Sequence, residues 1–263
     1  MIKKDTQGVT FAKGFTAAGV KAGIKKSGNL DVAVIYTKTQ AVVAGTFTQN
    51  KVAAAPVYVS KEVVATGTAH AIVANAGCAN ACTGQQGLDD AHKMAQIAAD
   101  ELGVNADDVI VGSTGVIGVN LPMDKLEAGI KDAVANLSAD GSGNAGRAII
   151  TTDTHSKSVT CEFELSGKTV CMGAIAKGSG MIRPNMATML CYITTDIAID
   201  QALLQKAVSG CVEKSFNMIS VDGDMSTNDM VIVLANGEAN NAKITEENAD
   251  YQIFFDKLMM LCT

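Results

Sequence analysis

Residues 177–190, with the sequence KGSGMIRPNMATML, lead from a Gly-rich loop into an apolar strand, LCYITT, at Leu190–Thr195. Two glycines and a proline in so short a span restrict the backbone to an unusual path. Beyond the strand, we predict a helix at Asp200–Phe216 with Asp200 as its N-cap, followed by a second apolar strand at Met230–Ala235. This order of elements predicts an α/β fold of layered sheets and helices.

The same mixture of strands and helices extends upstream. A run of apolar residues spaced for one helical face begins at Leu88 and stops at Gly103, and Pro122 opens a second such run. The buried run at Asp108–Val111 leads into Gly112–Gly115, which we predict to be a Gly-rich turn, and Asp140–Gly143 is predicted to be a loop. Further strands are predicted at Leu30–Thr37, Ala41–Phe47 and His70–Asn75, a hairpin at Ser158–Leu165 and Lys168–Ala176 with its turn at Ser166-Gly167, and a last helix from about Glu246.

Composition excludes several classes of protein. The chain has 263 residues, of which 48% are hydrophobic and 18% charged, as expected of a folded globular protein. Its net charge of −6 argues against nucleic-acid binding, which usually needs a basic face. There is no apolar run of the length of a membrane span and no apolar region of a signal peptide. We therefore expect a cytoplasmic protein that binds neither nucleic acid nor membrane.

Cysteine and histidine give no sign of a metal centre or a hydrolase triad. The seven cysteines contain no C-x-x-C pair, and only Cys78 and Cys82 lie close together. We expect reduced thiols of a cytoplasm-like compartment and no metal. The three histidines, His70, His92 and His155, are scattered and have no recognisable Ser or Cys partner by spacing.

The junction Ala187-Thr188 suits an intramolecular attack. The Thr188 hydroxyl would add to the carbonyl of Ala187, form an ester by an N→O shift, and leave Thr188 as a new N-terminus after hydrolysis. The α-amine released there, with an ordinary pKa of about 8, would serve the hydroxyl as its base. From the residues alone, a plain turn before a strand is the favoured interpretation, and the nucleophile is the alternative. A phosphate-binding loop is not supported, because GxxxxGK[ST] is absent.

The motif closely resembles the processing site of the ornithine acetyltransferases of arginine biosynthesis, which cleave themselves before the threonine of an A-T-M-L motif. The resemblance covers nearly the whole chain, since further blocks agree in order. These are Gly14–Lys25 (GFTAAGVKAGIK), Phe47–Val57 (FTQNKVAAAPV), Asn75–Gly84 (NAGCANACTG), Val111–Gly118 (VGSTGVIG), Thr151–Thr154 (TTDT) and Val221–Asp229 (VDGDMSTND).

The resemblance assigns roles to individual residues. It implies that Thr188 is the nucleophile, and that the hydroxyl of Thr114 and the backbone N–H of Gly115 form an oxyanion hole. It also implies that Thr151, Lys177 and Thr188 contact the substrate, with Lys177 suited to an α-carboxylate. Without the family, Ser113-Thr114-Gly115 favours a structural turn, Lys177 is equally open to being a solvated loop lysine, and Thr152 and Thr154 compete with Thr151.

The activity implied by the resemblance is a ping-pong transfer. The acetyl group of N2-acetyl-L-ornithine would pass to Thr188 and then to L-glutamate, with neither metal nor cofactor. Some members also accept acetyl-CoA as donor, and the residues leave this open. Cleavage would give an α-chain-like segment, 1–187, and the N-terminal part of a β-chain-like segment, 188–263, and relatives suggest an α2β2 assembly.

Two departures from the family keep alternatives open. Met225 replaces a small polar residue of the family's DGDTSTND block. Full-length relatives continue beyond position 263 and supply a glutamate and other substrate-binding residues there, so we expect this chain to be C-terminally truncated. The alternatives are an N-terminal-nucleophile amidohydrolase or aminopeptidase, and an inactive fragment. Small polar residues elsewhere are expected to be scaffolding: Asn75, Asn80, Thr83, Asp222, Asp224 and Asp229.

Overall fold

The computed structural model describes residues 2–4, 7–181 and 189–263. Its strands are β1 (Ile2–Lys4), β2 (Phe15–Val20), β3 (Val32–Phe47), β4 (Thr68–Cys78), β5 (Val109–Val116), β6 (Lys157–Leu165), β7 (Lys168–Lys177), β8 (Leu190–Thr195) and β9 (Met230–Ala235). Its helices are α1 (Ala55–Thr66), α2 (Gly84–Leu102), α3 (Met123–Ala135), α4 (Ser142–Ile149), α5 (Gln201–Glu213) and α6 (Ala249–Cys262). The strands form one sheet in the order β1-β6-β7-β8-β9-β3-β4-β5, and β2 pairs with β3.

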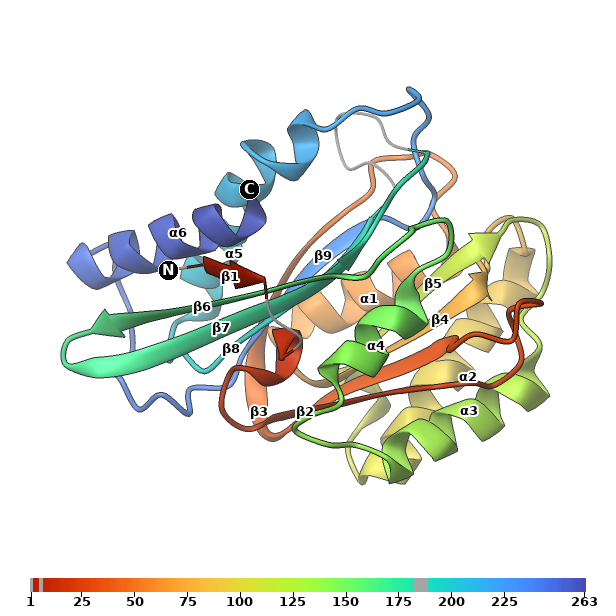
Figure 1. The fold of residues 1–263 in the computed structure, drawn as a ribbon, viewed down its shortest axis with the longest axis horizontal. Helices are drawn as coiled ribbons and strands as arrows, with labels where there is room; N and C mark the ends of the chain where they lie inside the picture. Colours follow the sequence, from red (N-terminus) through yellow and green to blue (C-terminus); the bar gives the residue numbers. More distant parts are fainter. Residues whose placement is uncertain (1, 5–6, 182–188) are drawn as a thin grey trace.

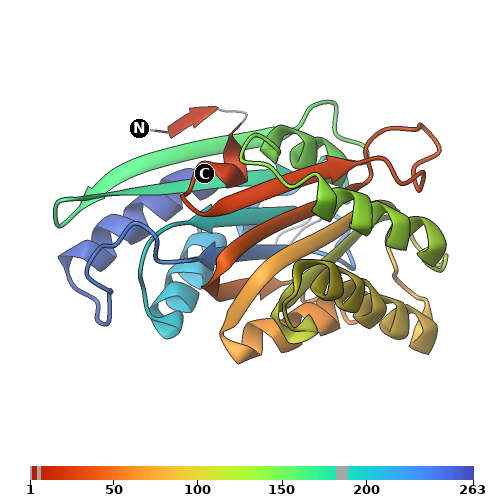
Figure 2. The same ribbon diagram turned by 90° about the horizontal axis from the view of Figure 1, so that it is seen from below.

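The predicted α/β architecture is confirmed, and helices cover the sheet in separate groups (Figure 1). α5 and α6 contact each other and pack against β3 and β6, whereas α2 and α3 contact each other and pack against β5 and β3. Figure 2 shows these two groups at opposite ends of the strands, with α4 on the other side of the sheet. No helix among the described residues has the length and apolarity to cross a membrane.

Several elements have the predicted positions. β8, β9 and the β6–β7 hairpin agree with the sequence analysis, and α3 begins directly after Pro122. Asp200 is the N-cap residue of α5, but its carboxylate pairs with Lys243 and makes no capping hydrogen bond. Hydrophobic periodicity predicted these elements correctly because the buried face of each one is encoded within a single contiguous stretch of sequence.

Other elements differ from the prediction. The two strands expected around residues 30–47 form the single strand β3, whose pairing with β4 shifts register between Tyr36 and Ala41. Helix α4 starts within the loop expected at residues 140–143, and its small residues pack closely on β2. The Cα of Gly141 lies so near the carbonyl of Ala17 that a Cβ would be 1.7 Å from its oxygen. Neither α1 nor β2 was predicted.

The predicted turn at Gly112–Gly115 is wrong, because all four residues belong to β5. Gly112 is required for close packing. A Cβ there would lie 2.2 Å from the hydroxyl oxygen of the fully buried Tyr192 in β8. Three strands separate β8 from β5 in the sheet order, so a flat sheet would hold them about 19 Å apart. The sheet is therefore strongly curled, and small residues on its concave face make the curl possible.

Candidate active site

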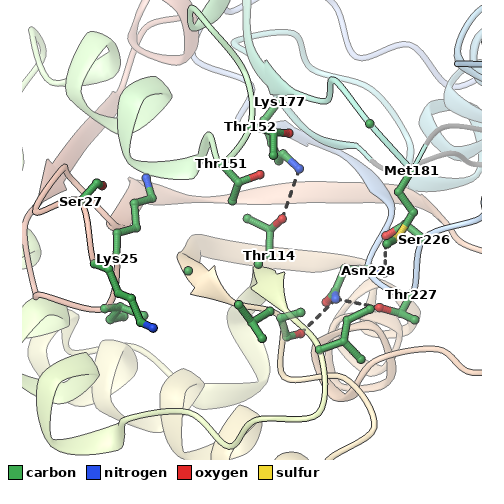
Figure 3. Close-up of a pocket in the computed structure, with 18 residues that line it drawn as sticks. Lys25, Ser27, Thr114, Thr151, Thr152, Lys177, Met181, Ser226, Thr227 and Asn228 are labelled. Atoms are coloured by element: carbon green, nitrogen blue, oxygen red, sulfur yellow. Dashed lines mark hydrogen bonds between the residues drawn. The ribbon is translucent and has the colours of Figure 1, made fainter. Parts of the chain in front are cut away.

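A pocket of about 700 Å³ lies where the carboxyl ends of β4, β5 and β7 meet. Its walls come from six separate stretches of the chain, which the curled sheet brings together (Figure 3). The lining residues are Ile24, Lys25, Lys26, Ser27, Gly77, Ala79, Thr114, Gly115, Val116, Ile117, Thr151, Thr152, Lys177, Gly180, Met181, Ser226, Thr227 and Asn228.

Four residues singled out from the sequence line this pocket: Thr114, Gly115, Thr151 and Lys177. Figure 3 shows the side chains of Thr114, Thr151 and Lys177 gathered at its centre. Ala187 and Thr188, the expected cleavage junction, lie outside the described residues. The structure thus joins Thr151, Lys177 and the two predicted oxyanion residues in one cavity, while their chemical roles stay predictions.

The lysine and the hydroxyl at the centre of the pocket are joined directly. Lys177 is the last residue of β7 and is only 3% exposed, which excludes a solvated loop lysine. Its Nζ donates to Thr114 Oγ1 over 3.2 Å. Burial lowers the pKa of Lys177, against the opposing charges of Asp153 and Asp229. Because the Thr114 oxygen accepts from the ammonium, its own proton is left to donate to another acceptor.

Thr151 and Thr152 both line the pocket and both are exposed, so the geometry keeps them as alternatives. Thr154 does not line it, and its hydroxyl contacts the ring of His155. Asp153, between Thr152 and Thr154, binds the chain directly after β7. Its Oδ1 accepts from the backbone N–H of Gly178 over 2.8 Å. Within the described ranges, no three His, Cys, Asp or Glu side chains gather as a metal centre would require.

An irregular strand end shapes the floor of the pocket. The pairing of β4 with β5 shifts register at Gly77/Cys78, opposite Gly115. Asn75, which is fully buried, holds this end of β4, donating to the carbonyl of Cys78 over 2.9 Å and accepting from the hydroxyl of Ser113 over 2.6 Å. Asn75 is therefore scaffolding near the site, as predicted, although it lies in a strand. Such bulges often redirect side chains beside active sites.

Gly115→Ala should unfold more easily than the parent chain. Gly115 has φ +135°, and a Cβ would lie 2.3 Å from the carbonyl carbon of Gly77. Backbone strain and the clash together predict a loss of about 3 kcal/mol in the free energy of unfolding. The matched control is Gly118→Ala, at φ +79° with nothing within 4 Å, which should lose about 1 kcal/mol from strain alone. Urea unfolding measures both, and equal losses would contradict this account of Gly115.

The chain on either side of the expected cleavage junction is fixed at the pocket. Lys177 of β7 is paired with Leu190 of β8, so the segment between them begins and ends at neighbouring positions of the sheet. Met181 N donates to Asp222 Oδ2 over 2.6 Å, and Met189 N donates to Asp229 Oδ1 over 2.8 Å. Both anchoring carboxylates come from the block at residues 221–229.

This block shows what sequence reasoning missed. Only its aspartates were given a role, as turn scaffolding, but Ser226, Thr227 and Asn228 form one wall of the pocket. Asn228 donates to the carbonyl of Ala79 over 3.0 Å, which ties this wall to the loop after β4. The density of small polar residues in VDGDMSTND was the available signal.

The loop at residues 24–27 was also missed, although it forms the opposite wall. Its backbone is held by Asp31, which is fully buried and accepts the N–H groups of Ile24 and Lys25 over 2.6 and 2.9 Å. Lys25 itself donates to the carbonyl of Ala148 at the end of α4 over 3.0 Å. Nothing in the local pattern of this loop indicates that it faces a cavity.

Comparison with known proteins gives a match to one family over most of the chain. Residues 16–263 match the ArgJ family. The arginine biosynthesis bifunctional protein ArgJ of Symbiobacterium thermophilum is 52% identical over 253 residues, which are 95% of this chain and 63% of that protein. The chain thus spans less than two thirds of the length of such curated relatives.

Solved structures agree with the fold. The ornithine acetyltransferase of Mycobacterium tuberculosis, solved with ornithine, is 40% identical with a TM-score of 0.66, and the match covers 72% of this chain and 99% of that chain. The L-aminopeptidase D-Ala-esterase/amidase of Ochrobactrum anthropi has a TM-score of 0.53 at 12% identity, covering 98% of this chain and 85% of that one. At that identity only the fold is shared, so the likeness says nothing of an aminopeptidase activity here.

Proposed function

The chain belongs to the ArgJ family, and from this premise we propose that it is a self-cleaving acetyltransferase. In the proposed reaction, the Thr188 hydroxyl attacks the acetyl carbonyl of N2-acetyl-L-ornithine, helped by the α-amine that cleavage has freed. Ornithine leaves, and L-glutamate accepts the acetyl group from Thr188. No metal or organic cofactor takes part in this scheme.

The observation that carries the proposal is the buried Lys177–Thr114 hydrogen bond beside the anchored ends of the cleavage segment. It supplies a hydroxyl whose proton is free to donate and a cation close by. Donors aimed at the position where negative charge develops are often the largest catalytic contribution. Thr114 Oγ1 and the N–H of Gly115 are therefore proposed as the oxyanion hole.

We propose that cleavage divides this sequence into residues 1–187 and 188–263. The matched Mycobacterium tuberculosis chain supports this division. It is covered almost completely by 72% of the 263 residues, or about 189 residues, close to the length of the first proposed segment. Met189, directly after the junction, lies in the interior and is bonded to Asp229 and Met230. The two pieces would remain associated because β8 and β9 sit inside the same sheet.

Substrate contacts are proposed for Lys177, Thr151 and Thr188. A carboxylate entering the pocket would meet Lys177, whose charged form is disfavoured by burial until such a partner arrives. This fits the α-carboxylate of an amino-acid substrate. A contact of the Thr151 hydroxyl with the same ligand is supported by its position near Lys177 in the pocket (Figure 3).

Lys177→Met should raise the KM for acetylornithine about tenfold or more, since a hydrogen bond to a charged group contributes about 1.5–3 kcal/mol. Methionine keeps the length and apolar stem of the side chain, and removing a buried ammonium should leave the fold intact. Steady-state kinetics on active protein test this. Lys131→Met, at an exposed lysine of α3, is the control and should change nothing. An unchanged KM in Lys177→Met would remove this residue from the substrate site.

The activity is tested by supplying acetylornithine with and without glutamate. Transfer predicts N-acetylglutamate only when glutamate is present, whereas an amidohydrolase would release acetate in its absence. A protein with no chemistry would form no acetyl adduct on Thr188, as measured by mass spectrometry. Acetyl-CoA in place of acetylornithine distinguishes a bifunctional enzyme from a monofunctional one. The assay should be repeated on the full-length protein, because relatives carry further residues.

Assembly and location follow from the same proposal. An α2β2 arrangement is proposed for the cleaved, full-length protein, with small molecules as its other partners. A cytoplasmic location is supported by the seven cysteines, all of which are free thiols in the structure.

A further inference from the structure

The pocket is cationic although the chain as a whole is acidic. Three lysines line it, Lys25, Lys26 and Lys177, and none of the described lining residues is an aspartate or a glutamate. The whole chain, by contrast, has a net charge of −6. A cavity whose walls carry charge of one sign raises the local concentration of ligands of the opposite sign. The pocket therefore suits an anion.

Within the described ranges, the ammonium groups of Lys25 and Lys177 donate only to neutral oxygens. Lys25 Nζ donates to the carbonyls of Leu30 and Ala148 over 2.5 and 3.0 Å. Lys177 Nζ donates to the Thr114 hydroxyl over 3.2 Å. The ion pairs between described residues involve other lysines, which are Lys131, Lys157, Lys206 and Lys243. An ammonium has three N–H donors, so Lys25 retains one for a ligand and Lys177 retains two.

The charges around the pocket favour an anion between these two lysines. Burial lowers the pKa of Lys25, the carboxylate of Asp31 opposes this effect, and the ammonium of Lys177 lowers the pKa further. The oxygens of Asp31 accept backbone N–H groups of the same loop. Burial also lowers the pKa of Lys177, against the charges of Asp153 and Asp229. An anion between two partly desolvated cations stabilises the charged form of both.

The two lysines belong to different walls of the pocket. Lys177 is the last residue of β7, whereas Lys25 lies in the loop that follows β2. Figure 3 shows Lys25 on one side, Lys177 on the other and Thr151 between them. At about 700 Å³ the cavity has room for a whole amino acid, since small-molecule sites span about 300–1,000 Å³. This arrangement suits a ligand that carries a carboxylate at each end.

We propose that Lys25 is a second carboxylate site, which binds the side-chain carboxylate of the acetyl acceptor while Lys177 binds its α-carboxylate. The inference rests on the proposed function, and it assigns the selection of a dicarboxylic amino acid, L-glutamate, to Lys25. The two substrates of the proposed reaction then interact with Lys25 in opposite ways. The side-chain ammonium of ornithine is repelled, which favours its release from the pocket, and the side-chain carboxylate of glutamate is attracted.

The experiment measures the binding of L-glutamate and L-glutamine to this chain by isothermal titration calorimetry, at neutral pH and low salt. The two ligands have nearly the same shape, and only glutamate carries the second negative charge. The parent chain should bind glutamate about tenfold more tightly, because charge-assisted hydrogen bonds are about twice as strong as neutral ones. Lys25→Met should bind the two ligands about equally, and Lys25→Arg, which keeps the charge, should retain part of the preference.

Lys21→Met is the matched control. Lys21 lies in the same loop and is exposed, but it does not line the pocket. This variant should keep the parent's preference for glutamate. Lys25→Gln replaces Lys25→Met if that variant fails to fold, because its amide can donate to the carbonyls of Leu30 and Ala148 without carrying a charge. It should likewise lose the preference.

Steady-state kinetics separate a binding role of Lys25 from a structural one. In a ping-pong reaction, kcat/KM for acetylornithine reports on the free enzyme, and kcat/KM for glutamate reports on the acetylated enzyme. Lys25→Met should lower kcat/KM for glutamate about tenfold and change kcat/KM for acetylornithine much less. A general distortion of the pocket would lower both values.

The possible outcomes separate the inference from the proposed function. A Lys25→Met chain that keeps the preference for glutamate, or a parent chain that lacks it, would overturn the inference and leave the proposed function standing. A parent chain that forms no acetyl adduct on Thr188 would overturn the proposed function. In that case, loss of the glutamate preference in Lys25→Met would still support Lys25 as a carboxylate site.

Discussion

Thr188→Ala is expected to remain one chain of 263 residues, whereas the parent chain separates into pieces of 187 and 76 residues (263 less 187). Alanine removes the oxygen proposed to attack the carbonyl of Ala187, so the effect should be complete. Intact mass spectrometry after denaturation reads the result directly. Acetyl transfer should disappear as well, because neither the nucleophile nor its free amine would exist.

Thr188→Ser is the control for this prediction. Serine keeps the hydroxyl and loses the β-methyl group that restricts χ1, so cleavage should continue at a reduced rate. A Thr188→Ala chain that still divides between residues 187 and 188 would refute the proposed nucleophile. Cleavage at another bond would place the junction elsewhere.

Thr114→Val is expected to lower kcat for acetyl transfer about 10²- to 10³-fold, the usual cost of losing one oxyanion donor. Valine has nearly the same shape as threonine, so the 6% exposed site should stay packed. The Lys177 ammonium loses its hydrogen-bond partner in this variant. The KM should change much less than kcat, because the oxyanion exists only beyond the ground state.

Thr114→Ser keeps the hydroxyl and should stay within about fivefold of the parent. A Thr114→Val enzyme with nearly unchanged kcat would exclude Thr114 from the oxyanion hole. The double variant of Thr114 and Lys177 provides a further check. Since the two side chains are in contact, their effects on kcat/KM should be far from additive.

Part of this fold could be predicted from the sequence because it depends on residues that are neighbours along the chain. The strand at Leu190–Thr195 and the hairpin turn at Ser166-Gly167 are set by short-range hydrophobic pattern and turn chemistry, and the structure has both. The α/β class follows from the same patterns. Prediction from local pattern was wrong where a residue is required by a contact distant in the sequence. Gly112 and Gly115 indicate a turn by composition, but in the structure they leave room for Tyr192 and Gly77.

The candidate site also has a part that could be predicted from the sequence and a part that could not. The motif around Ala187-Thr188, and the blocks containing Thr114, Thr151 and Lys177, could be selected from residue type and order alone. Their meeting in one pocket could not, since Lys177 and Thr114 lie at the ends of strands with four others between them in the sheet. Asp229 was assigned to a turn because an isolated aspartate among small polar residues has no distinguishing local signal.

The sequence by itself therefore determined the class of fold, several of its strands and helices, and the segment in which backbone cleavage is expected, because these depend on neighbours along the chain. Tertiary structure alone decided that the sheet curls, that Lys177 meets Thr114, and that Asp229 is buried against Met189 with one oxygen unpaired. Burial and long-range contact create those properties, and no contiguous stretch of residues contains them.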